Sequence, residues 1–203
     1  MNVLIIGPTN LTSKIVLKDS LEKGHHVTVF VRKPVVGIAH PNLHIARGDV
    51  LDFLSLDTAT HGQDAVIVLL DLDQNEPSTL LSDGTTNIIA AMKKNNVRRL
   101  ICLSSAGILD NDATFFFSKF IVPIFMKEIF ADKKRQLKVV EESDLDWTLI
   151  RSTPIVERRK SDKTEVTFDK PSNGRIFVGD LSEFIISLLE ENKYIHQMPI
   201  VSN

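Results

Sequence analysis

Residues 1–33 read MNVLIIGPTNLTSKIVLKDSLEKGHHVTVFVRK, with an apolar run near each end and a helix-like segment between the two. The first run, 3–6, is followed by a turn that starts at Gly7, and the second, 27–31, ends at Arg32 and Lys33. Strand, glycine turn, helix and strand is the layout of a βαβ unit that binds a dinucleotide at its turn. We therefore expect an α/β protein with a Rossmann-like doubly wound parallel sheet and a cofactor site beside this turn.

The turn keeps one of the three glycines of the full fingerprint. Gly7 allows a tight exit from the strand, whereas Asn10 and Ser13 stand where the second and third glycines are expected. Asparagine tolerates a left-handed backbone better than most residues, and serine is small. The first helical amides could then face a pyrophosphate, with hydroxyl donors added by Thr9, Thr12 and Ser13. An ordinary strand-to-helix turn with a polar cap explains the same residues.

The end of the second apolar run predicts which dinucleotide is preferred. Enzymes that bind the unphosphorylated form usually have Asp or Glu at this point, to accept from the ribose hydroxyls. This chain has Arg32 and Lys33 and no carboxylate. A guanidinium fork suits a 2′-phosphate, so we expect NADP as the cofactor. The alternative is a solvated basic turn.

Short apolar runs alternate with helical patterns along the rest of the chain, as in a parallel sheet covered on both faces. We expect a single NAD(P)-binding domain over 1–203, in which 154–203 is a small C-terminal elaboration that forms the substrate-side lobe. The patterns predict strands at 43–46, 65–70, 99–103, 147–151, 165–168, 176–178 and 199–201, and helices at 77–95 and 181–191.

Motifs along nearly the whole chain carry a family resemblance. They are Gly7-x-Thr9-x-x-x-Ser13, Val31-Arg32, Gly48-Asp49-x-x-Asp52, 87–92 with 97–100, 147–154 and 175–181. In this order they resemble the atypical short-chain dehydrogenase/reductase-like proteins of the NmrA-like and flavin/biliverdin-reductase type. The resemblance implies either a reductase or, as in regulatory NmrA-like proteins, a cofactor sensor.

The resemblance also implies positions for the cofactor. Asp49 and Val50 would flank the adenine, although Asp49 could instead cap the next helix, which is the interpretation we favour for Asp52. Leu69, Leu70 and Asp71 would lie beside the nicotinamide ribose. The complete expected set is Gly7, Thr9, Asn10, Leu11, Thr12, Arg32, Lys33, Asp49, Val50, Leu69, Leu70, Asp71 and Ser104.

The catalytic residues are harder to place. Ser105 ends the strand after which such reductases place a hydroxyl near the substrate carbonyl, where it could hydrogen-bond a developing alkoxide; it could equally satisfy strand-end backbone groups. The usual Tyr-x-x-x-Lys is absent, because the corresponding region has Phe130 and Lys134 and the single tyrosine is Tyr194. We name Ser105 and Lys134 as catalytic candidates. Hydride could pass to a conjugated acceptor with a proton from solvent or a nearby acid, or the dinucleotide is only sensed.

The segment 115–126 is the most hydrophobic of the chain. It is too short and too interrupted to cross a bilayer. A lid over a pocket for a small hydrophobic or aromatic substrate is one interpretation. A buried core helix and a homodimer surface are the others.

Composition narrows the partners and the compartment. A formal charge of −2 gives no nucleic-acid footprint, and we expect no membrane partner. The single cysteine, Cys102, lies in an apolar run and excludes an internal disulfide, which fits a reducing cytoplasm. The chain begins with a predicted strand, so we expect no signal peptide. The six histidines show no metal-ligand spacing, and His25 and His26 are expected to be solvated.

Overall fold

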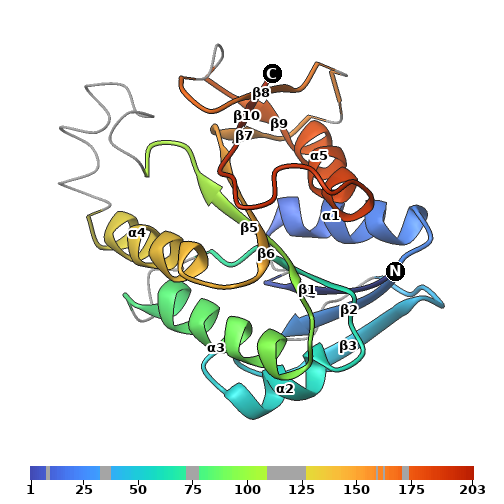
Figure 1. The fold of residues 1–203 in the computed structure, drawn as a ribbon. Coiled ribbons are helices and arrows are strands. Elements are labelled where there is room, and N and C mark those ends of the chain that lie inside the picture. Colours follow the sequence, from blue (N-terminus) through green and yellow to red (C-terminus); the bar gives the residue numbers. More distant parts are fainter. Residues whose placement is uncertain are drawn as a thin grey trace.

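The computed structural model describes residues 1–7, 10–32, 38–71, 78–108, 127–158, 160–161, 163–170 and 174–203. Strands and helices alternate over the first three quarters of the chain, apart from the consecutive strands His26–Val31 and Leu43–Arg47 (Figure 1). The elements are β1 (Asn2–Ile6), α1 (Leu11–Glu22), β2 (His26–Val31), β3 (Leu43–Arg47), α2 (Phe53–Thr60), β4 (Ala65–Val68), α3 (Leu80–Lys94), β5 (Arg99–Ser105), α4 (Lys127–Glu141), β6 (Asp146–Ser152), β7 (Ile155–Val156), β8 (Glu165–Thr167), β9 (Ile176–Phe177), α5 (Val178–Glu190) and β10 (Ile200–Ser202).

The main sheet has the strand order β3-β2-β1-β4-β5-β6-β10-β8. All neighbours are parallel except β8, which runs antiparallel to β10. The predicted doubly wound sheet is confirmed. The strand order reverses between β1 and β4, and ligands of such sheets bind beyond the carboxyl ends of the strands at that point.

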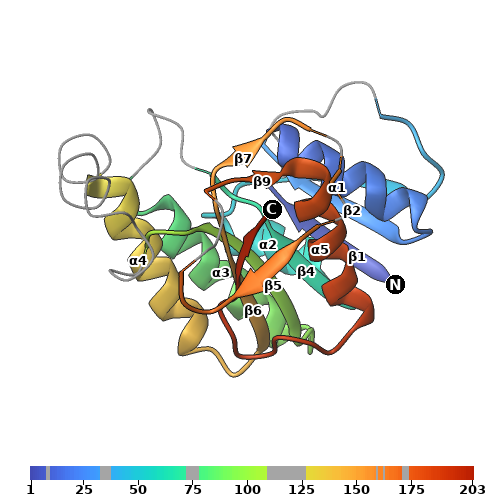
Figure 2. The ribbon, with the colours of Figure 1, turned by 90° about the horizontal axis from the view of Figure 1, so that it is seen from above.

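Two helical layers cover the sheet. Because strand side chains alternate between faces, Leu4 and Ile6 pack on the side of α2, α3 and α4, whereas Val3 and Ile5 pack on the side of α1 and α5. Both layers are visible in Figure 1, and the view from above separates α3 and α4 from α1 and α5 (Figure 2). Burial on both faces explains why these strands are almost continuously apolar.

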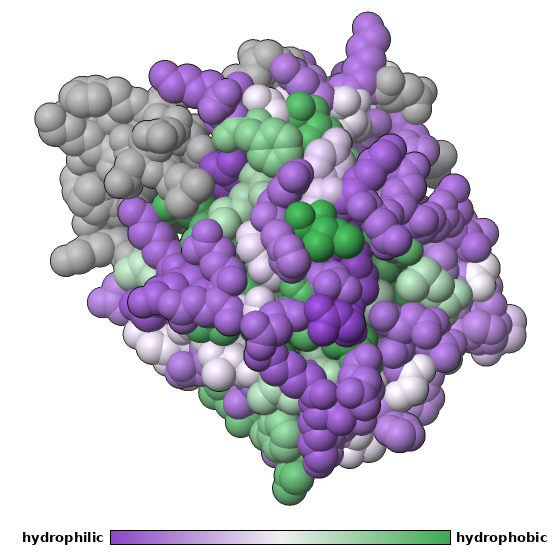
Figure 3. Space-filling view, in the orientation of Figure 1, coloured by the Kyte–Doolittle hydropathy of each residue, from purple (hydrophilic) through white to green (hydrophobic). Residues whose placement is uncertain are grey.

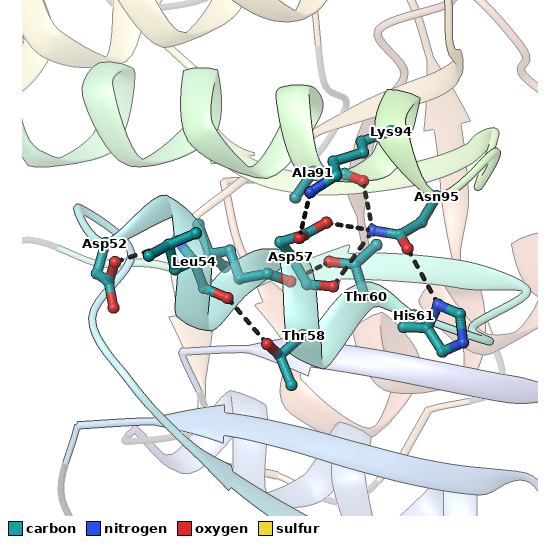
Figure 4. Close-up of polar contacts among 10 residues, drawn as sticks. Asp52, Leu54, Asp57, Thr58, Thr60, His61, Ala91, Lys94 and Asn95 are labelled. Atoms are coloured by element: carbon teal, nitrogen blue, oxygen red, sulfur yellow. Dashed lines mark hydrogen bonds and ion pairs between the residues drawn. The ribbon is translucent and has the colours of Figure 1, made fainter.

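Helix α2 is fastened to α3 by a polar cluster (Figure 4). Lys94 Nζ lies 2.6 Å from a carboxylate oxygen of Asp57, and Asn95 donates to the other oxygen at 2.9 Å. Hydrogen bonding from Lys94 lowers the pKa of Asp57. At the other end of α2, Asp52 caps the helix by accepting from the Leu54 amide at 3.1 Å, so the predicted Asp52 cap is confirmed. These contacts hold α2 against α3, and α2 begins directly after the 49–52 turn.

Some predicted strands and helices differ from the structure in where they begin or end. Strand β4 ends at Val68, two residues earlier than expected, and α5 begins at Val178, three residues earlier. The two-residue strand β7 is too short to be found from a pattern, and it pairs with β9 outside the main sheet.

Most residues on the face shown in Figure 3 are hydrophilic. Within the described part of the chain, no helix is long and apolar enough to cross a membrane.

Candidate functional site

The cleft at the switch point is built around the close approach of two strand ends. Gly7 follows β1 with φ +89°, in the left-handed region, and a Cβ at this position would lie 2.8 Å from the Leu69 carbonyl oxygen. Leu69 donates its amide to Ile6 at 2.9 Å, so the chain after β4 is fixed against the end of β1. Gly7 is thus required by conformation and by space. Its predicted role in the tight exit is confirmed.

The first turn of α1 presents its amides to this cleft. Asn10 is the helix cap, and its Oδ1 accepts from the Ser13 amide at 2.9 Å and from the Ser13 hydroxyl at 2.6 Å. Its φ of −96° is extended, so the expectation of a left-handed Asn10 in place of a glycine is wrong. Capping satisfies one of the free first-turn amides and leaves those of Leu11 and Thr12 without an intrahelical acceptor. These donors fit a pyrophosphate at the positive end of the helix.

Of three further residues predicted to bind the cofactor at this end of the site, the structure describes one. Arg32 lies exposed directly after β2, as the phosphate assignment requires. Thr9 and Lys33 lie outside the described residues. Strand register pairs Val31 with Arg47, so the end of β3 brings a second arginine to the same edge. The 2′-phosphate assignment of Arg32 and Lys33 stays a prediction.

The expected adenine wall is held by α3. Val50 is buried, and Asn87 donates to its carbonyl at 3.1 Å. A Cβ at Gly84 of α3 would lie 2.9 Å from a Val50 methyl group, so the helix approaches this side chain closely. Asp49 accepts from the Leu51 amide at 2.9 Å, which shows that one of its oxygens organises the turn. Asp49 and Val50 therefore lie together at the edge of the sheet, as their predicted role needs.

The reactive end of the cleft is a cavity of about 80 Å³ between the ends of β4, β5 and β6. Ser104 is buried in this wall, and its hydroxyl oxygen has no hydrogen-bond partner among the described residues. Such a group is costly unless a ligand or water completes it. The residues that line the cavity are Asn10, Thr12, Leu69, Leu70, Asp71, Leu103, Ser104, Ser105, Lys133, Ser152 and Ile155. Cofactor positions predicted at the ends of β4 and β5 thus line the same cavity as Ser105, the predicted catalytic serine.

The structure places a different lysine at this site from the one predicted. Lys133 Nζ donates to the Ser105 hydroxyl oxygen at 2.7 Å, whereas Lys134 is exposed on α4. Consecutive residues of a helix point about 100° apart, and it is Lys133 that reaches Ser105 on β5, so Lys134 is corrected to Lys133. The residue four positions before Lys133 is Ile129, which has no acidic proton. The expected absence of a tyrosine at this position holds for the corrected register as well.

Burial lowers the pKa of Lys133, and the negative charge of Asp71 partly opposes this effect.

The position of Lys133 depends on Asp132, its neighbour in α4. Asp132 is fully buried and accepts from the Leu81 amide at 2.8 Å and from the Ser82 hydroxyl at 2.5 Å. This carboxylate joins α4 to the start of α3 and so fixes the side of the helix that carries Lys133.

Ser152 is a further residue that the sequence reasoning missed. It pairs with Ser105 across β5 and β6, and its hydroxyl donates to the Ser104 carbonyl at 3.2 Å. The signal for it was a polar residue at the end of a predicted parallel strand. The segment 115–126, with its lid, core and interface interpretations, lies outside the described residues.

Comparison with known proteins gives a consistent result. Residues 9–192 match the family model described as NAD(P)H-binding. Cinnamoyl-CoA reductase 1 of Petunia hybrida is 30% identical over 122 residues, which cover 54% of this chain and 37% of that protein. The chain therefore spans little more than a third of the length of that relative.

Solved structures agree over the whole chain. A short-chain dehydrogenase/reductase from Veillonella parvula in complex with NADP superimposes with a TM-score of 0.85 at 18% identity, over 100% of this chain and 94% of that one. The anaerobillin reductase ChuY from Escherichia coli O157:H7 gives 0.81 at 15% identity, over 99% and 96%. At these identities the likeness establishes the shared fold.

Proposed function

The chain belongs to the NAD(P)H-binding family, and we propose that it is an NADP(H)-dependent reductase of a small hydrophobic acceptor. The observation that carries this proposal is the 2.7 Å contact between Lys133 and Ser105 in the same cavity as Asn10, Thr12 and Leu69. A hydroxyl linked to a cation beside a cofactor cleft is suited to a substrate oxygen that gains negative charge. Relatives named as reductases support this class of reaction.

The part of the cofactor that each residue would bind follows from its position in the cleft. The amides of Leu11 and Thr12 would hold the pyrophosphate, and Arg32 with Lys33 would hold the 2′-phosphate. Asp49 and Val50 would flank the adenine. Leu69, Leu70, Asp71 and Ser104 would surround the nicotinamide ribose. When bound, the reduced cofactor supplies a hydride.

The acceptor is expected to be apolar because part of the cavity wall is apolar. Leu70, Leu103 and Ile155 line it together with the serines, and Ile155 is 39% exposed. Such a wall favours a planar or aromatic group and excludes water from the reacting atoms. The hydrophobic 115–126 segment supports the same substrate class from sequence. We place the protein in the reducing cytoplasm because its single cysteine cannot form an internal disulfide.

A second candidate function is a cofactor sensor of the NmrA-like type. The observation that favours it is Ile129 at the position where related enzymes have a tyrosine. A sensor would bind NADP(H) and transfer no hydride. The two candidates make opposite predictions for turnover.

Calorimetric titration with NADPH and NADH, followed by NADPH oxidation assays with quinones, flavins and aldehydes, tests the proposal. We expect tighter binding of NADPH than of NADH, and turnover with at least one acceptor class. Binding without turnover across the panel would establish the sensor. Failure to bind either dinucleotide at millimolar concentration would refute both functions.

A further inference from the structure

We propose that Ser105 donates the proton that completes the reduction and that Lys133 replaces this proton, so that the pair does the work of the missing tyrosine. This inference rests on the proposed reductase function. Ser105 is the catalytic residue because it would touch the acceptor. Lys133 acts through Ser105 as its proton source.

The first support is the geometry of the pair. Ser105 is the last residue of β5, and its backbone is fixed by pairing with Ser152 and by the Ala106 amide, which donates to the Ser152 carbonyl at 2.8 Å. The Lys133 ammonium lies 2.7 Å from the Ser105 hydroxyl oxygen. Because the lysine is the donor in this contact, the Ser105 hydroxyl proton is free to point toward a ligand. Both residues line the cavity.

The second support is the electrostatic surroundings of the ammonium. Burial lowers the pKa of Lys133 and so brings it closer to the range of an effective acid. The titratable groups that face it are Asp71, after β4, and Cys102, on β5. The buried Cys102 thiol has its pKa raised to about 12, so it carries no charge at neutral pH. Asp71 is therefore the negative charge that favours the protonated form of Lys133 and opposes the effect of burial.

The step balances as follows. The acceptor gains a hydride from bound NADPH, which forms a C–H bond, breaks the π bond of the acceptor and moves its electron pair to the far atom. The Ser105 O–H bond breaks as its proton bonds to that atom, and a proton passes from the Lys133 ammonium to the Ser105 oxygen. A proton taken up from the solvent then restores the ammonium. The sum is acceptor plus NADPH plus a proton, giving reduced acceptor plus NADP⁺.

Three variants separate this role from a structural one: Ser105→Ala, Lys133→Met and Lys133→Arg. Arginine keeps the positive charge and donors but does not release a proton. Lys138→Met is the matched control, because Lys138 is exposed on the same helix and pairs with Glu142. The measurements are NADPH affinity by calorimetry, the pH dependence of kcat with an accepted substrate, and the pKa of Lys133 by NMR of protein labelled at lysine Cε.

We expect the three site variants to bind NADPH within about threefold of the native protein, and kcat to fall about 10²–10⁴-fold in each, the range for loss of acid catalysis. The basic limb of the pH profile should disappear in Ser105→Ala. Combining Ser105→Ala with Lys133→Met should cost no more than either change alone, because the residues act as a unit. Lys138→Met should keep the native rate and profile.

Recovery of most of the rate by Lys133→Arg would overturn the proposal, since charge alone would then suffice. Loss of NADPH binding in Lys133→Met with an unchanged kcat at saturation would make the lysine a cofactor anchor and would also overturn it. If no acceptor is turned over by the native protein, the reductase function itself fails. In that case the NMR titration still tests the role of Lys133 as the proton source for Ser105. A pKa at or above the ordinary lysine value refutes this role. A lowered pKa that changes in Ser105→Ala supports the pairing of the two residues.

Discussion

Gly7 and Gly24 form a matched pair for measuring what the cofactor turn requires. Both have positive φ, +89° and +83°, so alanine at either position has the same backbone penalty of about 1–2 kcal/mol. A Cβ at Gly24 would meet nothing within 4 Å, whereas at Gly7 it would lie 2.8 Å from the Leu69 carbonyl oxygen. Because this neighbour is backbone, the ends of β1 and β4 must separate, at a further cost of about 1–3 kcal/mol.

Gly24→Ala should therefore lower the free energy of unfolding by about 1–2 kcal/mol, and Gly7→Ala by about 2–5 kcal/mol. For a chain of this size each kcal/mol corresponds to about 2–4 °C in Tm. Urea unfolding gives the free energies, and calorimetry with NADPH should show weakened binding in Gly7→Ala and native affinity in Gly24→Ala. Equal stabilities of the two variants would refute the argument that contact with Leu69 makes glycine necessary.

Three further changes test other parts of the structure. Arg32→Ala should weaken NADPH binding by about 1–3 kcal/mol, the loss of a charged hydrogen bond, and leave NADH affinity nearly unchanged in parallel titrations; equal losses would remove the phosphate assignment. Burial lowers the pKa of His25, so the unfolded chain binds a proton more readily than the folded one. The free energy of unfolding, measured with urea, should therefore be at its full value above pH 6.5 and fall below that pH. This fall should be smaller in His25→Gln and unchanged in His26→Gln. Asp132→Asn should cost about 1–3 kcal/mol in urea unfolding because it disrupts a buried carboxylate's contacts with α3, whereas Asp144→Asn, in an exposed pair with Lys93, should cost under about 1 kcal/mol.

The sheet and the location of the cleft could be predicted because strands that are buried on both faces appear in the sequence as continuous apolar runs. The runs at 3–6, 27–31 and 99–103 become β1, β2 and β5, and their parallel pairing brings Gly7 and Ser105 to one edge. Asp52 was identifiable as a cap because a polar residue directly before a helix has few other roles. These features depend on local pattern and on rules of strand connection.

Backbone conformation at single residues was less predictable. Asn10 was expected in a left-handed conformation by analogy with a glycine, but its side chain caps α1, and capping requires an extended backbone. His25 was expected in solvent, yet it is 5% exposed, because its amide bonds to Ser20 and returns the chain over α1 into β2. Both contacts are local: Asn10 bonds to Ser13, three residues later, and the His25 amide bonds to Ser20, five residues earlier. Both errors therefore come from assigning these residues by analogy and by turn position, and not from their bonding to the adjacent helix.

The lysine error had a different origin, because the sequence does contain the signal. Phe130, Leu137 and Val140 are buried on the sheet side of α4. Positions 130, 133, 137 and 140 follow one another at steps of three, four and three, the spacing of one helix face, so this stripe includes position 133. Matching the chain to Tyr-x-x-x-Lys from the aromatic Phe130 selected Lys134 instead. Periodicity is set by packing along the whole helix, whereas the motif match depended on a tyrosine that this chain lacks. Where a motif has lost its defining residue, the buried stripe of the helix is therefore the better guide to which side chain reaches the site.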